Sequence, residues 1–504
     1  MKNRILTIIL ITAFILSSCK KALDLNPLDQ ISTTTFWKSK SDFDMGLTAV
    51  YSSLQKEEFS FGSPFRDCLS DNGYAQFNSG SVNDIDGGNL NPTTGGYETA
   101  IYNDAYSGIA RVNLFLQQLA AYTGADVTDA IRKQYEGEVR FVRAFYYYQL
   151  YTIYGDVPLV TQPLTLANQK QPKVTADKIL AQITSDLDYS IANLSTDPYF
   201  KNYGHAVSSS AKALKARVLI YAAYGTTGTA DVTIMKQVTD LCQQVMSQYT
   251  LSKNFEDLFH DATQKGNTEL IFTINFLAPN NTQPGDMYFG DWDAAAPLLN
   301  LVNDYEYTDG LAYGVSPLTD AVHPFLNRDP RLAKTVYKDS VYFGPGKVHH
   351  PSNPRPTGYG VIKFLEPNNI PYGFSTLSQQ DVVVLRLGEI LLMYAEAENE
   401  VNGPDAAVYQ AMTTLRARVG MPPFPAGLTQ DQMRQRIRHE RRVELAFEGL
   451  RHFDLMRWHL GATVLNNFKG SLIPYKFDDK FYKWPLPQIE IDKSGGVLVQ
   501  NPNY

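Results

Sequence analysis

The sequence of 504 residues predicts a mainly α-helical protein, built from helical hairpins with long loops and a few short strands. Two observations support this prediction. Apolar residues recur at helical spacing through much of the first half of the chain and again near the C-terminus. The intervening segments lack this periodicity and are rich in Gly, Pro, Ser, Asn and Asp, which is typical of loops. We therefore expect one long array of helices instead of several separate domains.

The first four helices are predicted from apolar stripes. Ser41 is expected to cap the first helix, and Thr175 is expected to open the fourth. In each stripe the apolar residues share one helix face. The stripes are Phe43, Leu47, Val50, Tyr51 and Leu54; Ile101, Ala105, Ile109, Val112, Leu116 and Leu119; Ile131, Tyr135, Val139, Val142, Tyr146 and Leu150; and Ile179, Ile183, Leu187, Ile191 and Leu194.

Two further features complete the predicted scaffold. Ser210 precedes a fifth helix, whose alanines let neighbouring helices approach closely. A later hairpin joins residues 385–401 to 405–419 through Asn402-Gly403-Pro404. Paired helices of this length, with Ala and Tyr at their contacts, predict a TPR-like right-handed array, although no strict repeat of about 34 residues is present. Only short segments, such as Leu270–Phe276 and Gly360–Phe364, are predicted as strands.

The N-terminus has the pattern of a lipoprotein signal. Lys2 and Arg4 precede an apolar run that ends at Leu16, which is too short to span a bilayer. Small residues before Cys19 fit removal of residues 1–18, after which Cys19 carries acyl chains; two or more chains anchor a protein stably. The alternative is an ordinary signal peptide followed by a chance cysteine. We expect residues 19–40 to tether an exported protein to a membrane of the bacterial envelope.

Composition narrows the function further. The net charge of −7 argues against nucleic acid as a partner. No later segment approaches the roughly 18 uninterrupted apolar residues of a membrane helix. Cys68 and Cys242 are far apart in sequence; an oxidising compartment allows them to pair, but two isolated thiols are more often buried and inert.

Short motifs follow one another along most of the chain. They are Leu23–Pro27, Thr35–Trp37, Gly137–Tyr147, Tyr154–Val160, Asp329–Arg331, Leu385–Leu387, Tyr394–Ala397, Glu440–Leu445, Gly449–Trp458, Trp484–Pro487 and Gln500–Tyr504. Together they resemble the SusD/RagB family of nutrient-binding outer-membrane lipoproteins of Bacteroidetes. Within these motifs, Arg434–Trp458 alternates Arg with acidic residues, so we interpret it as packing and salt-bridge chemistry.

The resemblance implies a helical fold with TPR-like pairs and a non-catalytic function. Members sit as a lid on a SusC-like, TonB-dependent transporter, capture a glycan or in some branches a peptide, and pass it to the pore. A single domain over residues 41–504 is expected, with an N-terminal part to about 260 and a C-terminal part from about 265. Lys20-Lys21-Ala22 lacks the acidic cluster that favours export to the outer face, so the outward orientation rests on the resemblance.

Ligand-binding residues are expected in the long loops 59–98, 275–323 and 342–373, whose aromatic content argues against disorder. Sugars present C–H faces that stack on flat aromatic rings, with polar groups around them. Trp37, Trp458 and Trp484 lie in family motifs and are predicted to be core residues. Trp292 lies in no helical stripe, so we predict that it is a stacking platform for a sugar ring, assisted by Tyr288 and Asp291. The alternative is that the Trp292 side chain packs within its own loop and holds that loop in place.

The second half of the site is predicted in the loop after the first helix, where aromatic, charged and amide side chains suit paired hydroxyl groups. In the family the corresponding loop often faces ligand; solvated loop polarity is the alternative for each residue. The candidates are Phe65, Arg66, Asp67, Asp71, Asn72, Tyr74 and Asn78.

Other chemistries have weaker support. Asp84-Ile85-Asp86-Gly87 resembles the start of a calcium loop, but Gly95 stands where the closing Glu belongs. A looser calcium site stays open because some relatives bind calcium; no other cofactor or metal is expected. No nucleophile elbow, phosphate loop or zinc motif is present in the sequence, so no enzyme is predicted. Three functions remain: a glycan-binding lipoprotein, a peptide-binding one, and a purely structural lid on a transporter.

Overall fold

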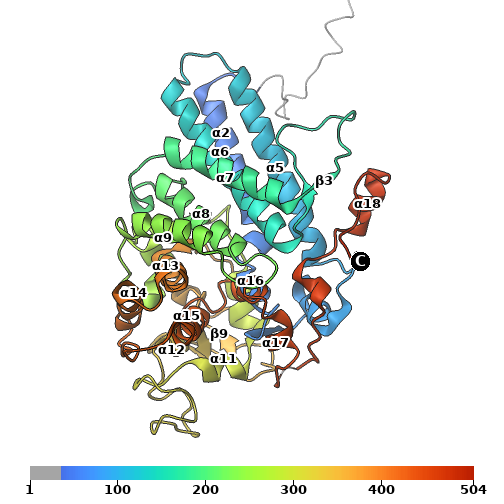
Figure 1. Cartoon of the computed structure of the whole chain (residues 1–504). Helices are drawn as coiled ribbons and strands as arrows, with labels where there is room; N and C mark the ends of the chain where they lie inside the picture. The colour runs from blue at the N-terminus through green and yellow to red at the C-terminus, as the bar shows by residue number, and fades with distance from the viewer. Residues whose placement is uncertain (1–35, 471) are drawn as a thin grey trace, which may run out of the picture.

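The computed structural model describes residues 36–470 and 472–504. The predicted signal peptide, the lipidated Cys19 and most of the predicted tether lie outside the described residues. The described chain is mainly helical with short strands, which confirms the predicted fold class (Figure 1).

The first four long helices gather at one end of the molecule (Figure 1). They are α2 (Lys40–Ser52), α5 (Tyr97–Ala121), α6 (Asp129–Ile153) and α7 (Ala176–Asn193). Helix α6 packs between α5 and α7, and α2 lies against α5. A Cβ atom at Gly108 of α5 would lie 2.1 Å from the ring of Tyr146 on α6, so only glycine permits this close approach. The small residue opposite a large tyrosine illustrates how these paired helices fit together.

The array continues through α8 (Ser208–Ala222), α9 (Val232–Met246), α13 (Leu387–Asn402), α14 (Ala406–Ala417) and α15 (Gln430–Glu444). Helix α9 packs against both α8 and α13, so segments far apart in sequence form one stack. The predicted hairpin at Asn402-Gly403-Pro404 is confirmed, and Gly403 adopts a φ of 77° there. One hydrophobic cluster of buried residues runs from Phe43 to Leu498.

Two predicted helix starts were wrong. The cap of α2 is Ser39, because its extended backbone lets Oγ accept from the Asp42 amide at 3.4 Å. Helix α8 begins at Ser208, and Ser210 lies inside its first turn, where its hydroxyl donates to the carbonyl of Ile271 at 2.6 Å. Thr175 does stand at the N-terminus of α7, as predicted.

The strands of the described residues form antiparallel pairs: β1 (Gly73–Ala75) with β5 (Ala295–Pro297), β2 (Val157–Pro158) with β3 (Lys173–Val174), β4 (Leu270–Ile274) with β10 (Val382–Arg386), β6 (Val336–Tyr337) with β9 (Gly360–Val361), and β7 (Val341–Tyr342) with β8 (Val348–His349). Strand β10 was assigned in part to a helix from the sequence. Its run of valines instead pairs with the fully buried β4, and α13 begins directly after it.

Short helices fill the loops between these elements. They are α3 (Ser63–Asp67), α4 (Val82–Asp84), α10 (Asp261–Gln264), α11 (Leu299–Asp304), α12 (Arg331–Thr335), α16 (Arg451–Arg457), α17 (Gly461–Leu465) and α18 (Gln488–Ser494), with the π-helical turns η4 (Ile85–Asn89) and η7 (Asp286–Asp291) and the 3₁₀ turns η1 (Ser53–Gln55), η2 (Glu57–Phe59), η3 (Ser79–Ser81), η5 (Tyr199–Lys201), η6 (Phe255–Leu258), η8 (Pro367–Asn369) and η9 (Asp479–Tyr482).

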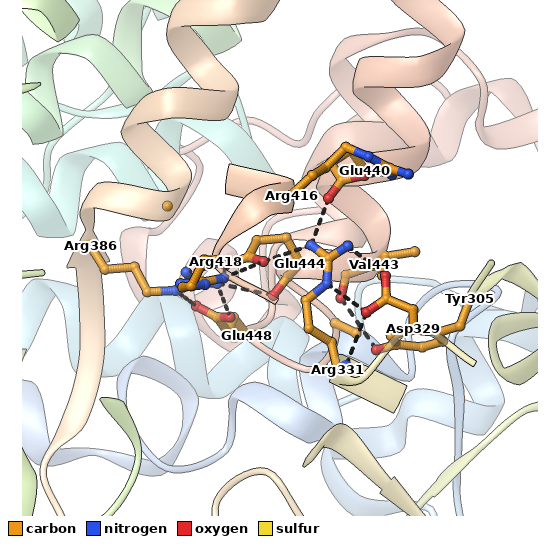
Figure 2. Close-up of polar contacts among 12 residues, drawn as sticks. Tyr305, Asp329, Arg331, Arg386, Arg416, Arg418, Glu440, Val443, Glu444 and Glu448 are labelled. Carbon is orange, nitrogen blue, oxygen red and sulfur yellow. Dashed lines mark hydrogen bonds and ion pairs between the residues drawn. The ribbon is translucent and has the colours of Figure 1, made fainter. Parts of the chain in front are cut away.

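The charged C-terminal helices form a buried ion-pair network, as the alternating Arg and acidic residues predict (Figure 2). Glu444 lies at its centre and pairs with Arg331 at 2.8 Å and Arg386 at 2.6 Å. Arg331 also pairs with Asp329 at 2.6 Å. Burial alone would raise the pKa of Glu444, but Arg418, Arg386 and Arg331 outweigh it and hold that pKa well below its usual range. The network joins α12, β10 and α15 through their side chains.

The remaining predictions for the core are mostly confirmed. Trp458 and Trp484 are buried, and Trp37 packs on the hydrophobic core while partly exposed. Cys68 and Cys242 are buried free thiols, so they form no disulfide.

Candidate functional site

Five aromatic side chains from three loops form one group, which we call the aromatic patch: Phe61, Phe77, Tyr288, Trp292 and Phe374. Trp292 is central, with ring centroids 5.6 Å from Tyr288, 5.6 Å from Phe374 and 6.1 Å from Phe77. Phe77 is 50% exposed and Phe374 is 79% exposed, so the patch reaches the surface. An apolar group this exposed is typical of a binding surface.

The turn η7 holds Tyr288 and Trp292 in place. The amide of Trp292 donates to the carbonyl of Met287 at 3.0 Å, and the amide of Ala294 donates to the carbonyl of Tyr288 at 2.9 Å. Between them, Asp293 adopts a positive φ of 49°, which reverses the chain into β5. These backbone bonds close the turn from which both rings project.

Two carboxylates tie this turn to neighbouring loops. Asp286 accepts from the amide of Glu366 at 2.9 Å and from the side chain of Asn369 at 2.6 Å, and burial raises its pKa to about 7. Asp291 accepts from the amide of Ser352 at 3.2 Å and lies 3.6 Å from a ring nitrogen of His349. Asp291 is buried and binds the 342–373 loop in this structure, so its predicted contact with ligand stays a prediction.

Strand pairing brings the two predicted halves of the site together. Strand β1 pairs with β5, and the amide of Gln76 donates to the carbonyl of Ala294 at 3.0 Å. Phe77 follows directly and contacts Trp292 edge-on. Tyr74 lies on β1 opposite Ala296 and is partly buried, and Asn78 is exposed beside Phe77.

Helix α3 carries three of the predicted residues, and all of them are buried. The ring of Phe65 packs against the aromatic patch, and its centroid lies 5.9 Å from the centroid of the Tyr288 ring. Arg66 donates to the side chain of Gln149 at 3.0 Å. Asp67 accepts from the amide of Phe447 at 2.6 Å, so it anchors the loop before α16.

The side chains of Asp71 and Asn72 also bind partners inside the protein. Asp71 pairs with Arg442 and Arg451, each at 2.9 Å, and these two guanidinium groups outweigh the effect of burial and lower its pKa to about 2. Asn72 accepts from Arg442 at 2.7 Å and donates to Asp67 at 2.8 Å. The expectation that Phe65, Arg66, Asp67, Asp71 and Asn72 contact ligand is therefore not met in this conformation, because their partners lie within the protein.

The segment Asp84-Ile85-Asp86-Gly87 resembles the start of a calcium loop in sequence, but its side chains are not arranged as in such a loop. Asp84 accepts from Asn78 at 2.8 Å, whereas Asp86 is buried beside Tyr475. In the described part of the chain, no group of three His, Cys, Asp or Glu side chains is arranged to hold a metal ion.

Three residues of the patch were missed from the sequence: Phe61, Phe77 and Phe374. Each lies in or directly beside a predicted loop rich in Gly, Pro or Ser. An isolated phenylalanine outside any apolar stripe is the signal that identifies them, and it is the same signal that singled out Trp292.

Two family profiles match this chain. The profile described as "SusD family" matches residues 255–504, and the profile described as "Starch-binding associating with outer membrane" matches residues 21–220. The chain belongs to the SusD family. This confirms the resemblance recognised from the short motifs.

Relatives match this SusD chain over nearly its whole length. SusD-like protein P38 of Formosa agariphila is 27% identical over 499 residues, which cover 92% of each chain. A SusD-like carbohydrate binding protein from Bacteroides fragilis has the same fold, with a TM-score of 0.80, 23% identity and coverage of 92% of this chain and 99% of its own. A laminarin binding SusD-like protein superimposes with a TM-score of 0.71 and 24% identity over 93% of this chain and all of its own. Among the described residues, none of the helices combines the length and apolar character needed to cross a membrane.

Proposed function

We propose that this SusD-family chain is a non-catalytic, cell-surface lipoprotein that binds an oligosaccharide on the aromatic patch and delivers it to a SusC-like, TonB-dependent transporter. The exposed group of rings around Trp292 carries the proposal. Sugar rings present C–H faces to such a platform, and the release of water from both apolar surfaces favours binding. By comparison with bases on aromatic side chains, one stacked ring contributes about 1–3 kcal/mol.

The arrangement of polar groups supports a sugar ligand. Asn78 is exposed next to Phe77, and Gln76 precedes it at the edge of the patch. Amide groups of this kind both donate and accept hydrogen bonds, which suits the hydroxyl groups at the rim of a sugar ring.

The comparisons agree with this proposal at the level of the family. One matching profile is described as starch-binding, and the names of two structural neighbours specify carbohydrate and laminarin binding. The predicted lipid on Cys19 would anchor the chain to a membrane, and the resemblance to the family supports the outer membrane and the outward orientation.

Peptide binding and a purely structural lid are the alternatives. Extended peptides add to the exposed edge of a sheet. The strands of the described residues are two to five residues long, which gives a peptide few backbone groups to pair with.

Calorimetric titration of the protein from residue 20 onward, against starch and laminarin oligosaccharides and mixed peptides, tests the proposal. A glycan signal that is lost in Trp292→Ala and retained in Tyr342→Ala, an exposed aromatic on β7, supports both function and site. A glycan signal unchanged by Trp292→Ala rejects the site. Binding of peptides without any binding of glycans rejects glycan capture in favour of the peptide-binding alternative.

A further inference from the structure

A buried carboxyl group follows directly after the central tryptophan of the aromatic patch. This residue is Asp293, whose side chain is fully buried. One of its carboxyl oxygens, Oδ1, accepts a hydrogen bond from the hydroxyl group of Tyr337 on β6, a ring that is also buried. The other oxygen, Oδ2, has no hydrogen-bond partner among the described residues. The bond to Tyr337 therefore joins the chain next to Trp292 to a strand that is distant in sequence.

A glycine lies where these two side chains meet. Gly360 on β9 is the Cα partner of Tyr337 in the β6–β9 pair. A Cβ atom at position 360 would overlap both Oδ1 of Asp293 and the ring of Tyr337. The hydrogen bond between the two side chains thus depends on the absence of a side chain at Gly360. We call Asp293, Tyr337 and Gly360 the Asp293 clamp.

The clamp acts on the backbone that carries the Trp292 ring. Asp293 has a φ of 49°, a conformation that is uncommon for residues other than glycine but is tolerated by Asp and Asn. The amide of the next residue, Ala294, donates to the carbonyl of Tyr288 at 2.9 Å. A change in the Asp293 side chain is therefore transmitted directly to the preceding peptide and to Trp292.

Burial makes this carboxyl group costly for the folded protein. The effect of burial outweighs the hydrogen bond from Tyr337 and the charge of Arg355, and it raises the pKa of Asp293 to about 7. The folded state consequently loses stability as the pH rises through about 7, because the unfolded chain ionises more easily. An apolar side chain would avoid this cost, but only a polar acceptor provides a directional hydrogen bond to Tyr337. We expect such a cost where geometry is needed for function.

We propose that Asp293 is a positioning residue for glycan binding: its hydrogen bond to Tyr337, which Gly360 permits, fixes the orientation of the Trp292 ring in the aromatic patch. Asp293 is too buried to touch a sugar, so it acts through Trp292. The consequence for glycan affinity rests on the proposed function, whereas the orientation of the ring can be measured without any ligand.

Fluorine NMR of the protein labelled with fluorotryptophan measures that orientation. The chain has four tryptophans, and the loss of one signal in Trp292→Phe assigns the signal of Trp292. This signal is expected to move in Tyr337→Phe and in Asp293→Gly, because glycine allows the positive φ but removes the carboxyl group. Asp293→Asn keeps an acceptor oxygen and is expected to retain the signal. Tyr342→Phe, at an exposed tyrosine of β7, is the matched control.

The outcome of this experiment decides whether the clamp orients the ring. The proposal is rejected if the Trp292 signal stays in place in Tyr337→Phe or in Asp293→Gly. It is also rejected if the signal moves as far in Asp293→Asn or in Tyr342→Phe. A clamp that only stabilised the fold would lower the melting temperature of the variants and leave the Trp292 signal where it is.

Calorimetry with starch and laminarin oligosaccharides then measures the effect on binding. Tyr337→Phe is expected to weaken the affinity about fivefold, the equivalent of one hydrogen bond, and Asp293→Asn should leave it unchanged. Gly360→Ala should also weaken the affinity. Gly87→Ala is its control, since the nearest atom to a Cβ there is 3.5 Å away, an ordinary contact.

The two experiments separate this inference from the proposed function. An unchanged affinity in a variant whose Trp292 signal has moved rejects the role of Asp293 in glycan binding. A protein that binds no glycan in any form rejects the proposed function instead, and the fluorine signals still decide whether the clamp orients Trp292.

Discussion

The carboxylate of Asp286 accepts a hydrogen bond of 2.6 Å from the side chain of Asn369, and this contact joins two of the loops that build the aromatic patch. Asp286 begins the turn that carries Tyr288 and leads to Trp292. Asn369 lies shortly before Phe374 in the other loop. The distance between the rings of Trp292 and Phe374 thus depends on a partly buried polar contact outside the patch itself.

Replacing Asp286 by alanine is expected to weaken glycan binding about five- to tenfold, although Asp286 is too buried to contact the ligand. The substitution leaves the amide of Glu366 and the side chain of Asn369 without their acceptor, which costs about 1–3 kcal/mol of stability. Calorimetry measures the affinity. Leu415→Ala on α14 serves as the control, because it destabilises the core but leaves the loops intact. Equal losses of affinity in both variants would exclude a positioning role for Asp286.

The pH dependence of stability should reveal the same residue. Burial raises the pKa of Asp286 to about 7 in the folded protein, whereas the unfolded chain has the ordinary value near 3.8. The folded state therefore holds a proton that the unfolded state releases. The stability due to this group is complete below about pH 4 and is lost as the pH rises through about 7.

Asp286→Asn stays neutral over this range, so it should gain stability relative to the unchanged protein as the pH rises from about 4 to about 7. The gain is limited to about 4 kcal/mol by the size of the pKa shift. Urea unfolding of both proteins at several pH values measures it. A constant difference between the two proteins would show that Asp286 does not titrate in this range.

Phe374 offers a cleaner test of direct contact than any buried residue. It is 79% exposed, so Phe374→Ala should leave the melting temperature almost unchanged. If sugar stacks on its ring, affinity should fall about fivefold, which corresponds to about 1 kcal/mol. Leu377→Ala is the matched control, since Leu377 is exposed on the same loop but is aliphatic. Identical affinities for the two variants would remove Phe374 from the site.

Much of the scaffold follows from local sequence patterns. The stripes at 43–54, 101–119, 131–150 and 179–194 predicted helices correctly, because burial on one face repeats with the helical period. The same reasoning identified Trp292, as a large aromatic residue that no stripe could bury. Strand β10 was missed because its partner β4 lies more than a hundred residues away in sequence.

The burial of the polar loop residues could not be predicted in the same way. Asp71 and Asn72 have the composition of a solvated loop, and nothing near them in sequence indicates otherwise. Their partner Arg442 follows some 370 residues later. Phe77 and Phe374 join Trp292 through long-range contacts of the same kind, the β1–β5 pairing and the Asp286–Asn369 bond. Helical periodicity is local, whereas the site depends on contacts between distant loops.

Glu444 is expected to be the most sensitive position of the charged core. Its carboxylate lies between Arg331, Arg386 and Arg418, all of them buried (Figure 2). Glu444→Gln would leave these guanidinium groups with less negative charge, and breaking a buried pair in this way costs about 3–5 kcal/mol. Glu490→Gln on α18 should cost less than about 1 kcal/mol, because Glu490 pairs at the surface with Lys493, whose side chain is 63% exposed. Urea unfolding midpoints compare the two variants, and similar midpoints would show that the network contributes to shape without contributing to stability.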